Sequence, residues 1–203
     1  MSYKLQNGKN YVISIIDYGA GNLKSISNAL KKVGADVDIA ERLDDADAIV
    51  LPGVGNFGDA MQKIRPLKQN LLDAIADGTP FLGLCLGLQV LFKGSEEAPG
   101  KGLGIIPGVC KRFTKGKVPH MGWNQITRMK GPLFDGLIEG DNFYFVHSYY
   151  GPVVEETSAV CSYGTDFSAA VEKANLYACQ FHPERSGANG LRVLANFVKE
   201  ARR

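Results

Sequence analysis

Short apolar runs alternate with helical patterns through the first half of the chain. The run Tyr11–Asp17 is short and rich in β-branched residues, as a buried strand is. After it, apolar residues recur at helical spacing from Leu23 to Val33, and Gly34 stands where a C-terminal cap is expected. Similar patterns predict strands over 36–40, 48–51 and 79–84, and helices over 67–76 and from 87 to about 93. This alternation is typical of a parallel sheet covered by helices on both faces.

The second half of the chain, from Gly104 to Gln180, consists mostly of strand-like runs and turns, which suits an antiparallel extension of the same sheet. The strands predicted there cover 109–114, 122–127, 143–149, 159–163, 169–172 and 177–181. An amphipathic helix follows, with Leu191, Leu194, Phe197, Val198 and Ala201 at helical spacing. We therefore predict a three-layer α/β fold, in which an open, mostly parallel twisted sheet with an antiparallel extension lies between helices.

The chain shows no repeat, linker or low-complexity tract. Its 203 residues are expected to form a single domain over residues 11–203, preceded by a polar extension over residues 1–10. The extension lacks the apolar stretch of a signal peptide, and no run is long enough to span a membrane. We therefore expect the reducing cytoplasm, where free thiols persist. None of the four cysteines forms a C-x-x-C pair, so neither a zinc ribbon nor a thioredoxin-like motif is expected. The net charge of +2 favours neither nucleic acid nor a membrane surface as partner, and no metal or cofactor is predicted.

The segment 83–87, with the sequence G-L-C-L-G, has the pattern of a nucleophile elbow. In such a segment a strand turns sharply into a helix, and glycines on both sides of the middle residue relieve the clashes of the turn. Cys85 would then stand above the sheet edge at a helix N-terminus, where the helix dipole favours the nucleophilic thiolate. A small buried cysteine between packing glycines is the alternative interpretation.

A nucleophile of this kind needs a base, and the base needs an orienting group. His182 follows an apolar strand and precedes Glu184 by two positions. Residues two apart at a strand end point the same way, and Pro183 is expected to stop the strand there. We predict that Glu184 holds the tautomer of His182 and stabilises its imidazolium form. The predicted catalytic residues are thus Cys85, His182 and Glu184.

Acyl transfer also requires hydrogen-bond donors for a tetrahedral oxyanion. The backbone N–H of Leu86, directly after the nucleophile, is one candidate. Another lies in 52–55, with the sequence P-G-V-G, where glycines allow a backbone N–H to be aimed into a site. An ordinary strand-to-helix turn would need the same glycines. The loop nevertheless follows the C-terminus of a strand, which is where ligands bind in open α/β sheets.

Three segments together resemble the class I, triad-type glutamine amidotransferases, whose fold is flavodoxin-like. They are 52–55 (PGVG), 83–89 (GLCLGLQ) and 180–184 (QFHPE), and the resemblance runs from about Val12 to the C-terminus. Further segments narrow the resemblance to the glutaminase subunits of imidazole glycerol phosphate synthase, which serve histidine biosynthesis. These are 17–22 (DYGAGN), 95–100 (SEEAPG), 119–124 (PHMGWN) and 144–149 (YFVHSY).

The resemblance implies hydrolysis of L-glutamine to glutamate and ammonia. Cys85 would form a γ-glutamyl thioester, and His182 would protonate the departing ammonia and then activate water. The oxyanion donors implied are the backbone at Gly53 and Val54 together with Leu86. The residues implied to form the glutamine pocket are Gly55, Gln89, Glu97, His147, Ser148 and Tyr149.

The same resemblance implies a partner, a cyclase subunit with a (β/α)8 barrel fold that forms a heterodimer with this chain and takes up its ammonia. Free ammonia would protonate and diffuse away, so such a glutaminase is useful only beside its acceptor. The predicted interface residues are His120, Met121, Trp123, Asn124 and Arg185. An aromatic residue among polar ones, as around Trp123, is common at interface hot spots, although a core position for Trp123 is the alternative. Arg185 stands where relatives often carry lysine.

Other functions remain open from the sequence: a paralogous amidotransferase subunit for amino-sugar synthesis, a stand-alone γ-glutamyl hydrolase, and a non-catalytic module. The joint presence of Cys85, His182 and Glu184 speaks against the last. A stand-alone hydrolase would work without a partner, whereas the proposed subunit should be nearly silent alone. Because uncoupled hydrolysis would waste glutamine, we also hypothesise that the Gly53–Val54 peptide points the wrong way until the partner binds its substrate.

Overall fold

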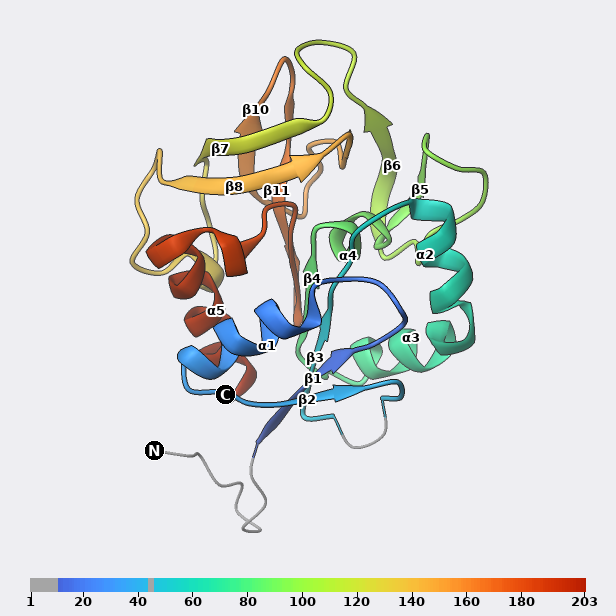
Figure 1. Cartoon of the computed structure of the whole chain (residues 1–203), viewed down its shortest axis with the longest axis vertical. Coiled ribbons are helices and arrows are strands. Elements are labelled where there is room, and N and C mark those ends of the chain that lie inside the picture. The colour runs from blue at the N-terminus through green and yellow to red at the C-terminus, as the bar shows by residue number, and fades with distance from the viewer. Residues whose placement is uncertain (1–10, 44–45) are drawn as a thin grey trace.

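A long twisted sheet organises the molecule (Figure 1). The computed structural model describes residues 11–43 and 46–203, so the predicted extension over residues 1–10 lies outside the described part. Side by side, the nine strands of this sheet are β2 (Asp36–Ala40), β1 (Val12–Ile16), β3 (Ala48–Leu51), β4 (Phe81–Leu84), β12 (Leu176–Cys179), β11 (Asp166–Lys173), β10 (Thr157–Ser162), β7 (His120–Thr127) and β8 (Asn142–His147). The strands from β2 to β12 run parallel, and from β11 onward each runs antiparallel to its neighbour. The predicted parallel sheet with an antiparallel extension is confirmed.

Helices cover both faces of the parallel half (Figure 1). They are α1 (Leu23–Lys32) and α5 (Gly187–Ala201) on one face, and α2 (Phe57–Ile64), α3 (Lys68–Ala76) and α4 (Leu86–Gln89) on the other, with 3₁₀ turns η1 (Arg65–Leu67), η2 (Pro132–Phe134) and η3 (Pro183–Arg185). In β1, Ile13 and Ile15 belong to the same core as Phe197 of α5, whereas Ile16 belongs to the core of Phe57 of α2. Successive side chains of a strand point to opposite faces of the sheet, so β1 contributes to the core on each face. Within the described residues, no helix is long and apolar enough to cross a membrane.

Helix α2 was not predicted from the sequence. Asn56 begins it, since its side-chain oxygen accepts from the backbone N–H of Gly58 at 2.8 Å. Its apolar residues Phe57, Ala60 and Ile64 are buried at helical spacing. Eight residues directly after a glycine-containing loop give a short periodic signal, which explains why the pattern alone missed it.

The helix predicted from Gly87 to about Lys93 is wrong in its second half. Helix α4 ends at Gln89, and the chain enters strand β5 (Phe92–Ser95). Val90, Leu91 and Phe92 are fully buried, and an apolar run buried on all sides has no periodicity that separates helix from strand.

Two other predicted strands lie elsewhere than expected. The strand predicted over 109–114 is β6 (Ile106–Arg112), and it forms a separate three-stranded sheet with β5 and β9 (Tyr149–Tyr150). The strand predicted over 143–149 is interrupted at Ser148, because β8 pairs with β7 and β9 pairs with β6. The strand predicted over 177–181 is β12, which pairs in parallel with β4 and so belongs to the parallel half. This parallel pairing brings the residues after β12 beside the end of β4.

Candidate active site

The chain turns sharply at Cys85, between the end of β4 and the start of α4. Cys85 has φ 53° and ψ −105°, a backbone conformation that residues other than glycine rarely adopt. A Cβ on Gly83 would lie 2.6 Å from the carbonyl oxygen of Gly87, and one on Gly87 would lie 2.1 Å from the carbonyl oxygen of Leu51. Only glycine therefore fits on either side of the turn. Because α4 has only four residues, its dipole favours a thiolate less than the predicted longer helix would.

His182 and Glu184 form a buried hydrogen-bonded pair. His182 Nδ1 lies 2.9 Å from Glu184 Oε1, and the two side chains are 7% and 3% exposed. Their proximity does not come from strand spacing as predicted, since β12 ends at Cys179. It comes from the 3₁₀ turn η3, which Pro183 opens. The backbone N–H of His182 also donates to the carbonyl of Tyr144 on β8, at 2.9 Å.

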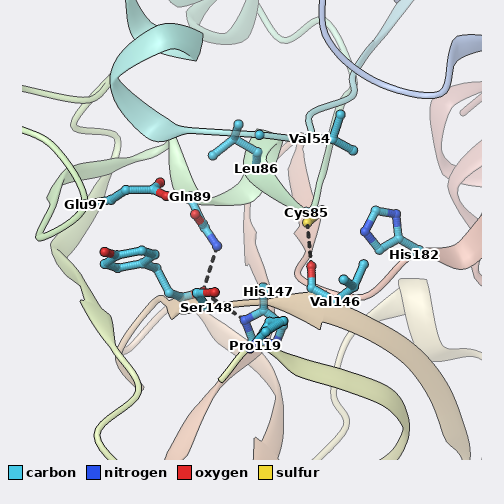
Figure 2. Close-up of a pocket in the computed structure, with 12 residues that line it drawn as sticks. Val54, Cys85, Leu86, Gln89, Glu97, Pro119, Val146, His147, Ser148 and His182 are labelled. Carbon is cyan, nitrogen blue, oxygen red and sulfur yellow. Dashed lines mark hydrogen bonds between the residues drawn. The ribbon is translucent and has the colours of Figure 1, made fainter. Parts of the chain in front are cut away.

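The charge environment of His182 favours its protonated form. Burial by itself would lower the pKa of His182, but Cys85 and Glu184 outweigh it and raise that pKa from 6.5 to about 10. Glu184 occupies Nδ1, while Nε2 has no hydrogen-bond partner within the described residues. The imidazole ring and the Cys85 sulfur face the same space in Figure 2. A buried imidazolium beside a cysteine is the arrangement that stabilises a thiolate.

A cavity of about 380 Å³ opens beside Cys85 and His182. Its other lining residues are Val54, Gly55, Leu86, Gln89, Glu97, Pro119, Val146, His147, Ser148 and Tyr149. All six residues predicted for the glutamine pocket are among them, although they come from separate segments of the chain. The structure thus brings these residues together, and their contacts with a substrate remain a prediction.

The polar groups of the pocket wall are held by the protein itself. Gln89 Nε2 donates to the carbonyl of Tyr149 at 2.8 Å and to Gln180 Oε1 at 3.0 Å. Glu97 Oε2 accepts from the backbone N–H of Phe57 at 2.8 Å, at the start of α2. Gln180 Nε2 in turn lies 3.6 Å from Cys85 Sγ. Gln180 was not predicted as a site residue; its only signal was its place as the first residue of the segment 180–184 that contains His182.

The predicted oxyanion donors are not both available in this structure. The backbone N–H of Leu86 donates to the carbonyl oxygen of Gly53 at 3.4 Å. That oxygen belongs to the Gly53–Val54 peptide, whose N–H therefore points the opposite way, since the peptide is planar. The Tyr18 hydroxyl donates to the preceding carbonyl, that of Pro52, at 2.8 Å. The loop thus presents an acceptor where an oxyanion would need a donor.

The predicted interface residues divide into a buried and an exposed set. His120 is only 3% exposed, so the prediction that it lies at a surface is wrong; the two-residue period of β7 turns it inward. Met121 and Trp123 are 62% and 57% exposed, so the core alternative for Trp123 is wrong as well. Arg185 stacks on the Tyr144 ring, 4.1 Å from its centroid. We call the surface formed by Met121, Trp123, Tyr144 and Arg185 the β7–β8 face.

Within residues 11–43 and 46–203, no cluster of three or more His, Cys, Asp or Glu side chains could hold a metal ion. The arrangement around Cys85 is instead that of covalent catalysis: a nucleophile on a strained turn, a base with one free nitrogen, and a carboxylate on its other nitrogen.

The sequence matches the family described as glutamine amidotransferase class-I over residues 14–201. The chain is 53% identical to the imidazole glycerol phosphate synthase subunit HisH of Methanothermobacter thermautotrophicus, over 93% of this chain and 98% of that protein. It is 50% identical to the same subunit of Thermococcus kodakarensis, over 92% of this chain and 98% of that protein.

Solved structures share the fold. One is a glutamine amidotransferase, with a TM-score of 0.74 and 18% identity over 94% of this chain and 99% of that one. Another is PurLQS from Thermotoga maritima, with a TM-score of 0.72 and 19% identity over 93% of this chain and 97% of that one. The family match, the relatives and the shared fold agree, and the chain belongs to the class I glutamine amidotransferases.

Proposed function

We propose that this chain is the glutaminase subunit of an imidazole glycerol phosphate synthase, and that residues 11–203 act as one domain that hydrolyses L-glutamine and passes ammonia to a cyclase subunit. The observation that carries the proposal is the placement of Cys85 and His182 at the wall of one cavity, with Glu184 hydrogen-bonded to His182 from behind. The relatives named as this subunit cover nearly the whole chain. The four cysteines, all buried and unpaired, suit a cytoplasmic enzyme.

The reaction follows from the positions of the three groups. The Cys85 sulfur attacks the side-chain amide carbon of glutamine, and the C–S bond forms as the carbonyl oxygen becomes an oxyanion. The protonated His182 gives its Nε2 proton to the departing ammonia, which leaves a γ-glutamyl thioester. His182 then takes a proton from water, which attacks the thioester and releases glutamate and the thiol. Glu184 keeps the Nδ1 proton of His182 in place throughout.

The inward carbonyl of Gly53 explains how the chain would avoid wasting glutamine. The oxyanion needs the N–H of Val54 beside that of Leu86, so the Gly53–Val54 peptide must turn over before the reaction is fast. Gly53 supplies the carbonyl of this peptide and Gly55 follows Val54, where a Cβ would meet nothing within 4 Å. We propose that the partner favours the turned peptide when it holds its own substrate.

The β7–β8 face suits the partner subunit, which we propose to be the (β/α)8 cyclase of a heterodimer. Trp123 packs edge-on to Tyr144, with ring centroids 6.1 Å apart, and Arg185 lies on the same tyrosine. Exposed Trp, Tyr and Arg are the residues most enriched at binding hot spots. The backbone of Tyr144 also accepts from His182, so this face lies directly over the catalytic histidine.

A coupled assay tests the proposal. Ammonia release from glutamine is measured for the chain alone, with the cyclase, and with the cyclase and its nucleotide substrate. We expect little hydrolysis by the chain alone and a large increase in the liganded complex. Full activity of the isolated chain would instead support a stand-alone γ-glutamyl hydrolase.

A further inference from the structure

Two buried histidines that take part in none of the proton transfers above hydrogen-bond to each other, and one of them, His147, lines the pocket. His120 on β7 and His147 on β8 are directly paired across the two strands, and His120 Nδ1 lies 3.0 Å from His147 Nε2. They are 3% and 6% exposed. Burial lowers the pKa of His120 to about 4 and that of His147 to about 3, so both rings are neutral at neutral pH.

The hydrogen-bond partners allow only one set of tautomers. His147 Nδ1 lies 2.8 Å from the carbonyl oxygen of Tyr149, which can only accept, so this nitrogen carries the proton. His147 Nε2 must then accept, and His120 Nδ1 must donate to it. His120 Nε2 is left as an acceptor, and Asn124 Nδ2 lies 3.2 Å from it. Asn124 therefore donates to His120, His120 donates to His147, and His147 donates to the Tyr149 carbonyl.

The Tyr149 carbonyl connects this chain of hydrogen bonds to the nucleophile. The same oxygen accepts from Gln89 Nε2, which fixes the amino end of that amide toward Tyr149 and toward Gln180 Oε1. With its oxygen held by Gln89, Gln180 presents its Nε2 to Cys85 Sγ at 3.6 Å. Gln180 is fully buried and Gln89 is 4% exposed, so neither amide has water to replace a lost partner. If the Gln89 amide were reversed, its oxygen would face the carbonyl oxygen of Tyr149. If the Gln180 amide were reversed, its oxygen would face the Cys85 sulfur.

We propose that His120 is a positioning residue of the active site: its Nδ1–H holds the Nε2 of His147, so that the Nδ1–H of His147 stays on the Tyr149 carbonyl and, through Gln89 and Gln180, an amide donor stays on the Cys85 sulfur. Without the His120 donor, the buried Nε2 of His147 would have no partner, and the ring would turn away from Tyr149 to find one. Only the activity measurements rest on the proposed glutaminase function; the hydrogen bond of His147 is a property of the chain itself.

The alternative is that His120 serves packing alone. Its ring lies between those of Tyr163 and Phe145, with centroids 4.0 Å and 5.0 Å away. Two variants separate the roles. His120→Phe keeps a planar ring between its neighbours but removes the donor. His120→Asn loses the ring, yet places an amide nitrogen close to the former position of Nδ1.

The test compares both variants with the parent chain in three measurements: the hydrogen bond of His147 Nδ1–H from its ¹H and ¹⁵N chemical shifts, kcat and KM for glutamine in the liganded cyclase complex, and thermal unfolding. We expect His120→Phe to lose the hydrogen-bonded Nδ1–H signal of His147 and at least about tenfold in kcat/KM, because a misplaced catalytic contact costs this much or more. We expect His120→Asn to keep that signal and most of the activity, although it is the less stable variant.

The opposite order would overturn the proposal. If activity simply followed stability, so that His120→Phe stayed active and His120→Asn did not, His120 would be a packing residue. An unchanged hydrogen-bonded Nδ1–H signal of His147 in His120→Phe would also overturn it. Absence of glutamine hydrolysis by the parent chain in its liganded complex would contradict the proposed function instead, while the signal of His147 would still decide the role of His120.

Discussion

At the scale of single residues, the pair of His182 and Glu184 determines the charge state of the site. Replacing Glu184 by glutamine keeps an oxygen near Nδ1 but removes the negative charge, so the pKa of His182 should fall from about 10. An NMR titration of the His182 ring in the parent chain and in Glu184→Gln measures this directly. An unchanged midpoint would show that Glu184 is not a source of the raised pKa.

The same pKa has a consequence for stability. Because the pKa of His182 is raised from 6.5 to about 10 on folding, its contribution is full below pH 6.5 and is lost as the pH rises through 10. Urea unfolding across that range should show stability falling with pH, and falling less steeply in Glu184→Gln. If the free energy of unfolding fell equally steeply with pH in the parent chain and in Glu184→Gln, the pH dependence would arise from another group.

Replacing Cys85 by alanine removes the only atom that can form the thioester, while the turn that holds it stays. We expect glutamine-dependent synthesis by the complex to disappear and ammonia-dependent synthesis by the cyclase to persist. Both rates are measured on the same preparation, so the ammonia reaction serves as the control for assembly. Loss of both would contradict the division of labour between the subunits.

Much of the site could be predicted from residue types, because its chemistry restricts them. Cys85, His182 and Glu184 were expected together, and the cavity also collects Gln89, Glu97 and their neighbours. Gln180 could not be predicted as a site residue, since a glutamine directly after an apolar strand carries no sign of which amide atom faces the sulfur. The burial of His120 depends on which face of β7 turns inward, and a strand with mixed residues on both faces does not reveal this.

At the scale of elements, the turn between β4 and α4 depends on glycine at two positions. A methyl group on Gly87 would press on the backbone of Leu51 in the neighbouring strand, which cannot move aside. Gly87→Ala should therefore lower the free energy of unfolding by about 3 kcal/mol or more. Gly78→Ala is the matched control: its φ is +91° but nothing lies within 4 Å, so only backbone strain of about 1–2 kcal/mol is expected. Equal losses in urea unfolding would refute the steric explanation.

Most strands and helices of the parallel half could be predicted in their order along the chain, because strands and helices differ in the period of their apolar residues. The pairing of strands that are distant in the sequence could not be predicted. Strand β12 lies beside β4 although more than ninety residues separate them, and this pairing brings the segment of His182 to Cys85. The short helix α4 and strand β5 share one fully buried apolar run, so only tertiary contacts decide where one ends and the other begins.

At the scale of the whole molecule, the β7–β8 face should bind the cyclase. Trp123→Ala removes a large exposed side chain that makes few contacts within the chain, so we expect the fold to persist and the dissociation constant to rise about tenfold or more. Calorimetric titration with the cyclase measures this. Ile39→Ala is the control, since Ile39 is also exposed but lies on β2, at the opposite end of the sheet. Equal affinity of the Trp123 variant and the parent chain would exclude this face.

The partner would control the reaction through the Gly53–Val54 peptide. If the N–H of Val54 faces Cys85 in about 1% of isolated molecules, full conversion to that state would accelerate hydrolysis about a hundredfold. We therefore expect a crystal structure of the complex with its nucleotide substrate to lack the contact between the Leu86 N–H and the Gly53 carbonyl, which is 3.4 Å long in the isolated chain. The unliganded complex is the control, because it separates the effect of docking from that of the nucleotide. A Gly53 carbonyl that points at Leu86 in both complexes would mean that the acceleration arises elsewhere.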